Sequence, residues 1–166
     1  AHADLRDELD GEKWSHACAA RRSLDKGAGQ LIQIGVRAWS REEAKFSEND
    51  NRIRTHLASD ILAVSNGQKV WESLMDELSM ISGPVWISVD IDVLDGYLVP
   101  STGTPVPGGL SWWHLESALA TIFESKNCNV LGADVVETVP DIEGSLTPFT
   151  AAMIATRLVG GHIHRS

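Results

Sequence analysis

Two aspartates at the end of an apolar segment are the first residues in this sequence that could carry chemistry. Asp90 and Asp92 follow the apolar segment 84–89, and Asp95 comes three residues later. Side chains two positions apart on a strand point to the same face, so the Asp90 and Asp92 carboxylates would lie side by side. Such a pair is costly to bury unless a cation compensates its charge. The pair predicts a divalent metal site at a strand end; the alternative is a surface turn whose carboxylates face water.

Two further groups have residue types that suit the same site. His2 and Asp4 lie two positions apart in a polar segment, and Glu137 follows the apolar segment 130–136. Alone, His2 and Asp4 could be neighbouring surface residues, and Glu137 could be a solvated carboxylate. In a parallel sheet, however, the carboxyl ends of the strands open on one edge, where sites form. Carboxylates with one or two imidazoles favour an ion such as Mn²⁺ over zinc in a thiolate site, and several carboxylates can bridge two ions.

The composition narrows the class of protein. The chain has 166 residues and a formal net charge of -9, which suits one domain with a core and argues against nucleic acid as a partner. Cys18 and Cys128 are the two cysteines, so neither a disulfide framework nor a zinc cluster is expected, and a cytoplasmic location is the default. No apolar run reaches transmembrane length, so no membrane partner is expected.

Hydrophobic periodicity predicts an α/β fold. Helices are expected over residues 12–25, 68–81 and 111–123, and from Thr147 to a close at Gly160 and Gly161. Strands are expected over residues 31–37, 61–64, 84–89 and 129–136. Strands that are apolar on both faces and alternate with helices indicate a parallel sheet covered by helices on each side. The aspartates at 90 and 92 would then lie at the edge of that sheet where sites form.

Successive motifs along the chain resemble those of one enzyme family. The motifs, in order, are Ala1-His2-Ala3-Asp4-Leu5, Ser15-His16-Ala17, Gln33-Ile34-Gly35-Val36-Arg37, Ser88-Val89-Asp90-Ile91-Asp92-Val93-Leu94-Asp95, Thr102-Gly103-Thr104-Pro105, Gly108-Gly109-Leu110 and Val136-Glu137. Their order and spacing resemble the ureohydrolase family, the superfamily of arginase, agmatinase and formiminoglutamase, with agmatinase the most similar. The resemblance covers nearly the whole chain.

The resemblance implies a three-layer α/β/α sandwich on a parallel sheet, with a binuclear manganese site. In this family a metal-bridging hydroxide attacks the guanidinium carbon, and urea leaves. The resemblance makes His2, Asp4, Asp90 and Asp92 metal ligands, with Asp90 bridging both ions. Glu137 would hold the substrate guanidinium by paired hydrogen bonds.

His16 matches the histidine that passes a proton to the leaving amine, although it could instead be a surface residue beside Trp14. The implied substrate is a linear guanidino compound, with agmatine first. The alternatives are other guanidino compounds, arginine or guanidinobutyrate, and the formimino compound formiminoglutamate. The family also implies a homo-oligomer, a trimer or a hexamer.

The sequence departs from the family pattern at its start. A bridging aspartate is expected immediately before Ala1, and a further histidine ligand on an earlier strand; neither is in the sequence. Residues 1–166 are therefore expected to be one ureohydrolase domain without its N-terminal strands. The alternative function is that of a catalytically incomplete fragment or subunit. Gly96 and Ser101 also stand where the family has proline and glycine.

Overall fold

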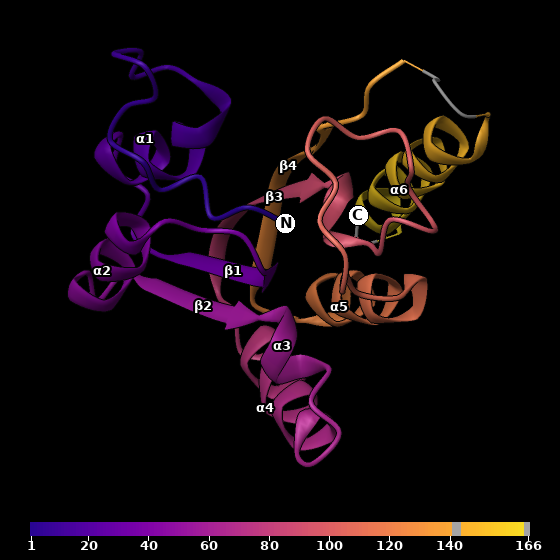
Figure 1. Ribbon diagram of the computed structural model, residues 1–166. Helices are drawn as coiled ribbons and strands as arrows, with labels where there is room; N and C mark the ends of the chain where they lie inside the picture. The colour runs from indigo at the N-terminus through magenta and orange to yellow at the C-terminus, as the bar shows by residue number, and fades with distance from the viewer. Residues whose placement is uncertain (141–143, 165–166) are drawn as a thin grey trace.

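The computed structural model describes residues 1–140 and 144–164 (Figure 1). Six α-helices, two short 3-10 helices and four strands lie in this part of the chain. In chain order they are η1 (His16–Cys18), α1 (Ala19–Asp25), β1 (Leu31–Val36), α2 (Arg41–Asn49), β2 (Ile53–Leu57), α3 (Ala58–Ile61), α4 (Gly67–Ser79), β3 (Gly83–Asp90), η2 (Ile91–Val93), α5 (Trp112–Glu124), β4 (Cys128–Val136) and α6 (Leu146–Ile163).

The strands pair in parallel, as the alternation of strands and helices predicts. β1 pairs with β2, and β3 pairs with β4 in a register that sets Asp90 opposite Val136. The α/β prediction is confirmed. Within the described residues the strands form two separate two-stranded sheets rather than one continuous ladder.

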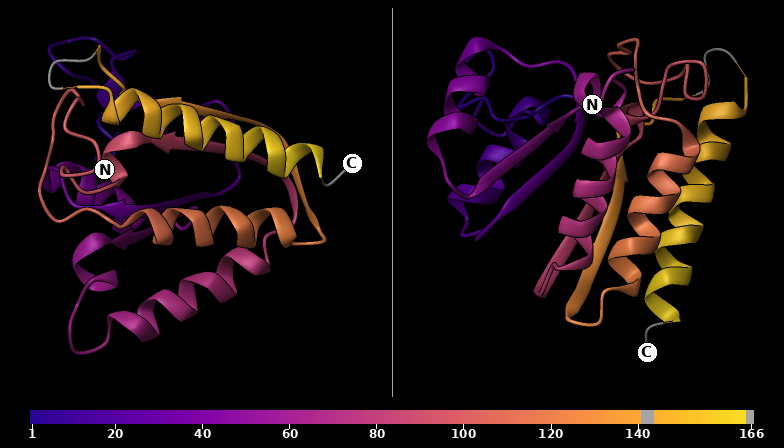
Figure 2. Two further views of the ribbon diagram at one scale, coloured as in Figure 1. Left: turned by 90° about the vertical axis from the view of Figure 1, so that its right-hand side faces the viewer. Right: turned by 90° about the horizontal axis from the view of Figure 1, so that it is seen from below.

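Helices cover the two sheets differently. Leu31 of β1 packs in a small core with α1 and α2, whereas Ile32 and Ile34 pack against the larger core, so β1 is covered on both faces. One face of β3–β4 packs against α5 and α6, in a large core to which α4 also contributes, and Figure 2 shows α5 and α6 running side by side next to β4. On the other face Trp86 and Leu131 are each 63% exposed. Within the described residues, β1 is therefore covered on both faces and β3–β4 on one.

The first residues of the chain lie between the two sheets, where Figure 1 places the N-terminus. The Ala1 nitrogen donates hydrogen bonds to the carbonyl oxygens of Gly35 (3.1 Å) and Asp92 (3.3 Å). The Arg37 amide donates to the Ala1 carbonyl at 3.0 Å. His2 and its neighbours are thus held at the carboxyl ends of β1 and β3, which is the predicted edge.

Three of the predicted element positions are wrong. The helix expected over residues 12–25 begins as α1 only at Ala19, after the short 3-10 helix η1. Residues 61–64 were expected to form a strand, but Ile61 ends α3, and the strand is β2. Arg54 and His56 interrupt the apolar pattern of β2, which hides it from a search for apolar runs. The third error concerns Gly160 and Gly161, which do not end α6; the helix continues to Ile163.

Gly161 lies inside α6 for a packing reason. A Cβ at this position would lie 2.4 Å from the Phe123 ring, so the missing side chain admits that ring of α5. In the described residues, no helix combines the length and apolar character needed to cross a membrane.

Candidate metal centre

The end of β3 is built differently from the simple strand that the sequence predicts. β3 ends at Asp90, and the next three residues form η2. The Asp90 carboxylate caps this short helix by accepting the Asp92 amide at 3.0 Å. Asp92 therefore lies in a helical turn, and strand alternation does not explain why the two carboxylates are close. The tight turn brings them together.

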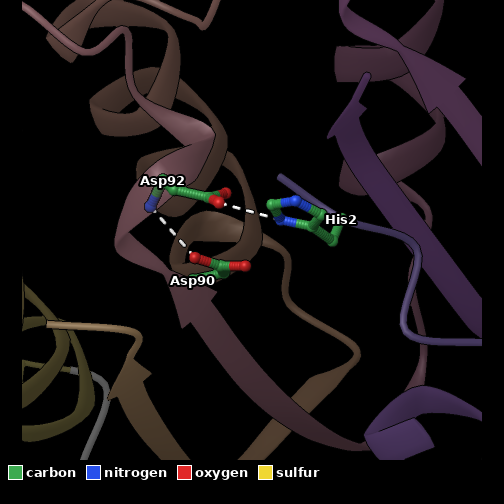
Figure 3. A group of neighbouring side chains, drawn as sticks. All are labelled: His2, Asp90 and Asp92. Carbon is green, nitrogen blue, oxygen red and sulfur yellow. Dashed lines mark hydrogen bonds and ion pairs between the residues drawn. The ribbon is translucent and has the colours of Figure 1, made fainter. Parts of the chain in front are cut away.

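His2, Asp90 and Asp92 form the candidate metal centre. One possible ligand atom from each residue lies within 4.8 Å of the others. His2 Nδ1 is 2.9 Å from Asp92 Oδ2, and the Ala1 nitrogen is 3.1 Å from Asp92 Oδ1. Figure 3 shows the histidine and the two carboxylates pointing toward one another from the N-terminal segment, β3 and η2.

The electrostatics of this centre suit a cation. Asp92 is 1% exposed, and among the described residues neither of its carboxylate oxygens accepts a hydrogen bond of good geometry, despite the two short ion-pair contacts. Burial raises the pKa of Asp90 to about 7, and the neighbouring Asp92 charge adds to the shift. A divalent ion would compensate both carboxylates. One imidazole with carboxylate oxygens is a donor set that suits Mn²⁺.

Asp4 lies beside this group but is not one of the three residues that converge. Its backbone has a left-handed φ of 54°. Burial raises the pKa of Asp4 to about 6, the Glu137 and Glu43 carboxylates add to this, and His2 and His16 oppose it. Asp4 therefore interacts electrostatically with His2 of the metal group and with both predicted catalytic residues, His16 and Glu137.

Two side chains hold the backbone on either side of Asp4. Gln33 Nε2 donates to the carbonyl of Ala3 at 2.6 Å, and the Leu5 amide donates to Glu43 Oε1 at 3.1 Å. These contacts explain how a non-glycine residue keeps a left-handed conformation here.

Glu137 follows β4 directly and has a left-handed φ of 62°. Its carboxylate lies against Gly103, where an added Cβ would be 3.2 Å from Glu137 Oε2. His16 is the first residue of η1 and is exposed. The structure therefore groups His2 with Asp90 and Asp92, and places the other predicted site residues around that group.

Arg37 lies in one of the motifs that resemble the family, but the sequence assigns it no role at the site. Its Nη2 donates to the carbonyl oxygens of Asp92 (2.7 Å) and Val106 (2.6 Å), and its Nε also donates to Val106 at 2.8 Å. Arg37 thereby ties the metal-site turn and the loop 96–109 to the end of β1. The sequence signal for Arg37 is an arginine directly after an apolar strand. The hydrogen-bond partners of Arg37 are main-chain oxygens, however, and no pattern of side chains in the sequence identifies such partners.

Asp95, the third aspartate of the motif, holds the loop and is not part of the metal group. Its carboxylate accepts the amides of Gly108 (2.9 Å) and Gly109 (2.8 Å). Burial opposes ionisation, but these backbone hydrogen bonds prevail and hold the pKa of Asp95 below its usual range. The loop therefore starts and ends at the same place, beside the metal centre.

The fold and the site define a class of protein. The model of the Arginase family matches residues 1–160, and the chain belongs to this family. Among its relatives, an agmatinase from Pyrococcus horikoshii is 38% identical over 160 residues, which are 96% of this chain and 52% of that protein. An N(1)-aminopropylagmatine ureohydrolase from Thermococcus kodakarensis is 33% identical over 160 residues, with 96% of this chain and 51% of that protein covered.

Solved structures agree with this assignment. The agmatine ureohydrolase of Thermoplasma volcanium superposes with a TM-score of 0.80 at 30% identity, over 98% of this chain and 52% of that one. An arginase from Medicago truncatula, at 24% identity and a TM-score of 0.77, shares the fold. The chain spans about half the length of the curated relatives that it matches.

Proposed function

We propose that this chain provides the metal-binding and guanidinium-binding part of a Mn²⁺-dependent ureohydrolase whose substrate is agmatine or a close linear guanidino compound. The observation that carries the proposal is the convergence of His2, Asp90 and Asp92 at a strand end, with Glu137 at the end of the adjacent strand. Membership of the Arginase family and the names of the relatives support the reaction class.

Each group has a definite chemical task in this proposal. Bound Mn²⁺ supplies Lewis acidity, which activates water and stabilises negative charge in the transition state. His2, Asp90 and Asp92 would hold the metal, with Asp4 as a further ligand, and the carboxylates would counter its charge. Glu137 accepts two N–H groups of the guanidinium, which orients the carbon toward the metal centre. His16 donates a proton to the leaving amine.

Agmatine is the first candidate substrate because relatives from several organisms are named agmatinase or N(1)-aminopropylagmatine ureohydrolase. Both names describe a substrate without a carboxylate. The net charge of -9 is compatible with such a cationic substrate.

A second candidate is a metal-binding unit that is catalytically incomplete. It is favoured by the described metal group, which contains three converging side chains and leaves Asp4 beside them. Three such ligands suit one ion better than two. This candidate predicts one bound Mn²⁺ per chain, whereas the binuclear enzyme predicts two.

Two measurements on one preparation test these candidates. Urea release is followed with agmatine, arginine and guanidinobutyrate, and formamide release with formiminoglutamate, after Mn²⁺ loading, and bound manganese is counted per chain. Urea from agmatine, absent in Asp90→Asn, would support the proposed enzyme. Absence of urea with every guanidino substrate would exclude it, and one tightly bound ion would then support the second candidate.

A further inference from the structure

Three residues of the long loop cross the end of β4 and hold the residue that follows it. This 101–103 strap consists of Ser101, Thr102 and Gly103. Thr102 and Thr138 form an antiparallel bridge, and the Val139 amide donates to the Ser101 carbonyl at 3.3 Å. The strap therefore adds a short piece of backbone pairing just beyond β4.

The Thr102 hydroxyl makes the contact that matters for Glu137. Thr102 Oγ1 donates a hydrogen bond to the Glu137 carbonyl at 2.9 Å, and Thr102 is 7% exposed. A buried hydroxyl that lost this acceptor would be left without a partner, which is unfavourable. The side chain and the Thr138 bridge thus fix the main chain at Glu137 and at the next residue.

The strap is itself anchored to the protein interior. The Ser101 amide donates to Thr147 Oγ1 at 2.9 Å, and Thr147 in the first turn of α6 is fully buried. The strap therefore has a fixed position between α6 and the end of β4. Movement of Glu137 would require the strap to move as well.

Glu137 needs such support because of its conformation. Its φ of 62° is in the left-handed region, which is unfavourable for a residue with a side chain. Gly103 provides space on the other side, since a Cβ there would lie 3.2 Å from Glu137 Oε2. One strap residue therefore holds the backbone of Glu137, and the next makes room for its carboxylate.

We propose that the 101–103 strap is a positioning device for Glu137, in which the Thr102 hydroxyl fixes the left-handed backbone and Gly103 leaves room for the carboxylate. The link to guanidinium affinity rests on the proposed function. The conformational part does not, because it concerns the backbone of Glu137 alone.

The test uses two matched pairs of variants. Thr102→Val keeps the shape of threonine and removes the donor, whereas Thr102→Ser keeps the donor. Gly103→Ala adds the crowding Cβ, and Gly96→Ala is its control, since a Cβ at Gly96 has nothing within 4 Å. Thr121→Val, which removes a hydroxyl that bonds the Ser117 carbonyl within α5, controls for loss of a threonine donor elsewhere.

Two readouts separate conformation from function. Backbone ¹³C chemical shifts of Glu137, measured without metal, report its left-handed conformation. Calorimetric titration of agmatine into the Mn²⁺-loaded protein reports guanidinium affinity. Loss of one neutral hydrogen bond corresponds to an affinity decrease of about fivefold. We expect Thr102→Val to shift the Glu137 signals and weaken agmatine binding by about that factor, with Thr102→Ser close to the unaltered protein.

Gly103→Ala should weaken agmatine binding in the same way, and Gly96→Ala and Thr121→Val should not. Unchanged Glu137 shifts in Thr102→Val would overturn the proposal, as would equal agmatine affinity in Gly103→Ala and Gly96→Ala. If Thr102→Val does not fold, the comparison of agmatine affinity in Gly103→Ala and Gly96→Ala decides whether the strap positions Glu137. If the unaltered protein binds no guanidino compound, the proposed function fails, and the Glu137 shifts still decide whether the strap positions this residue.

Discussion

Asp90 combines a structural role with an unusual ionisation. Its carboxylate caps η2, and burial together with the Asp92 charge raises its pKa to about 7. The raised pKa means that Asp90 holds its proton into a pH range where an ordinary aspartate is ionised. Because a metal ligand must be deprotonated, metal binding at this residue competes with that proton.

Metal affinity should consequently depend on pH in a defined direction. Below pH 7, Mn²⁺ must displace a proton from Asp90, so the affinity should fall toward about tenfold per pH unit between pH 7 and 6. Titrations of Mn²⁺ at pH 6, 7 and 8 measure this. Asp90→Asn should bind Mn²⁺ at least about tenfold more weakly at pH 8. The exposed control Asp60→Asn should bind as the unaltered protein does, and equal affinity in both variants would contradict Asp90 as a ligand.

The raised pKa of Asp90 also affects the stability of the metal-free protein. Here the effect of rising pH is unfavourable, whereas it favours metal binding. The folded state holds the Asp90 proton up to about pH 7, whereas the unfolded chain loses it near pH 4. Between these values the folded state binds more protons, so the contribution of Asp90 to the free energy of unfolding falls as pH rises. Urea denaturation of the unaltered protein and of Asp90→Asn at pH 4.5 to 7.5 should show their difference declining. A difference that grew with pH would contradict the assigned shift.

The sequence predicts site residues best where side chains meet side chains. His2, Asp90 and Asp92 were predicted from motifs, and the structure brings them together. Arg37 and Thr102 lie in the motifs, but the sequence predicts no role for them because both donate to main-chain oxygens. Such contacts depend on the conformation of a long loop, which residue types alone do not specify.

At the scale of elements, amphipathic helices were predictable and interrupted strands were not. α4 lies within one or two residues of its predicted range, because its apolar spacing is strong. β2 has polar residues at three of its five positions and depends on pairing with β1, a contact distant in sequence. The extent of α6 was missed for a similar reason, since its contact with Phe123 decides the role of Gly161.

The two glycines of α6 should respond oppositely to alanine. Gly160→Ala meets nothing within 4 Å and should stabilise the protein by about 0.5–1 kcal/mol, because alanine loses less backbone entropy in a helix. Gly161→Ala places a methyl group 2.4 Å from the Phe123 ring and should destabilise by about 1–3 kcal/mol through overpacking. Urea denaturation of both variants measures the two changes. Equal stabilisation by both would show that α5 and α6 are not packed as described.

At the scale of the whole molecule, the uneven covering of the two sheets is the main feature that the sequence did not reveal. The sequence of β3 is an apolar segment, which predicts burial. Trp86 of this strand is nevertheless exposed, and its indole nitrogen donates a hydrogen bond to the Asp134 carboxylate at 2.6 Å. Whether a face is covered depends on which helices reach it, and the described helices that pack on β3–β4 share one face. An apolar segment therefore predicts a strand, but not a cover for both of its faces.

The uncovered face of β3–β4 should promote association between copies of this chain. Leu131 and Trp86 are each 63% exposed there, and Val136 is 41% exposed. Exposed apolar side chains gathered on one sheet face are a common cause of association. Leu131→Lys places a charge on this face and should lower the weight-average mass in sedimentation velocity at raised protein concentration. Val64→Lys is the matched control, because Val64 is fully exposed in a turn away from the sheet. If the two variants sediment alike at every concentration, the open face of β3–β4 does not drive association.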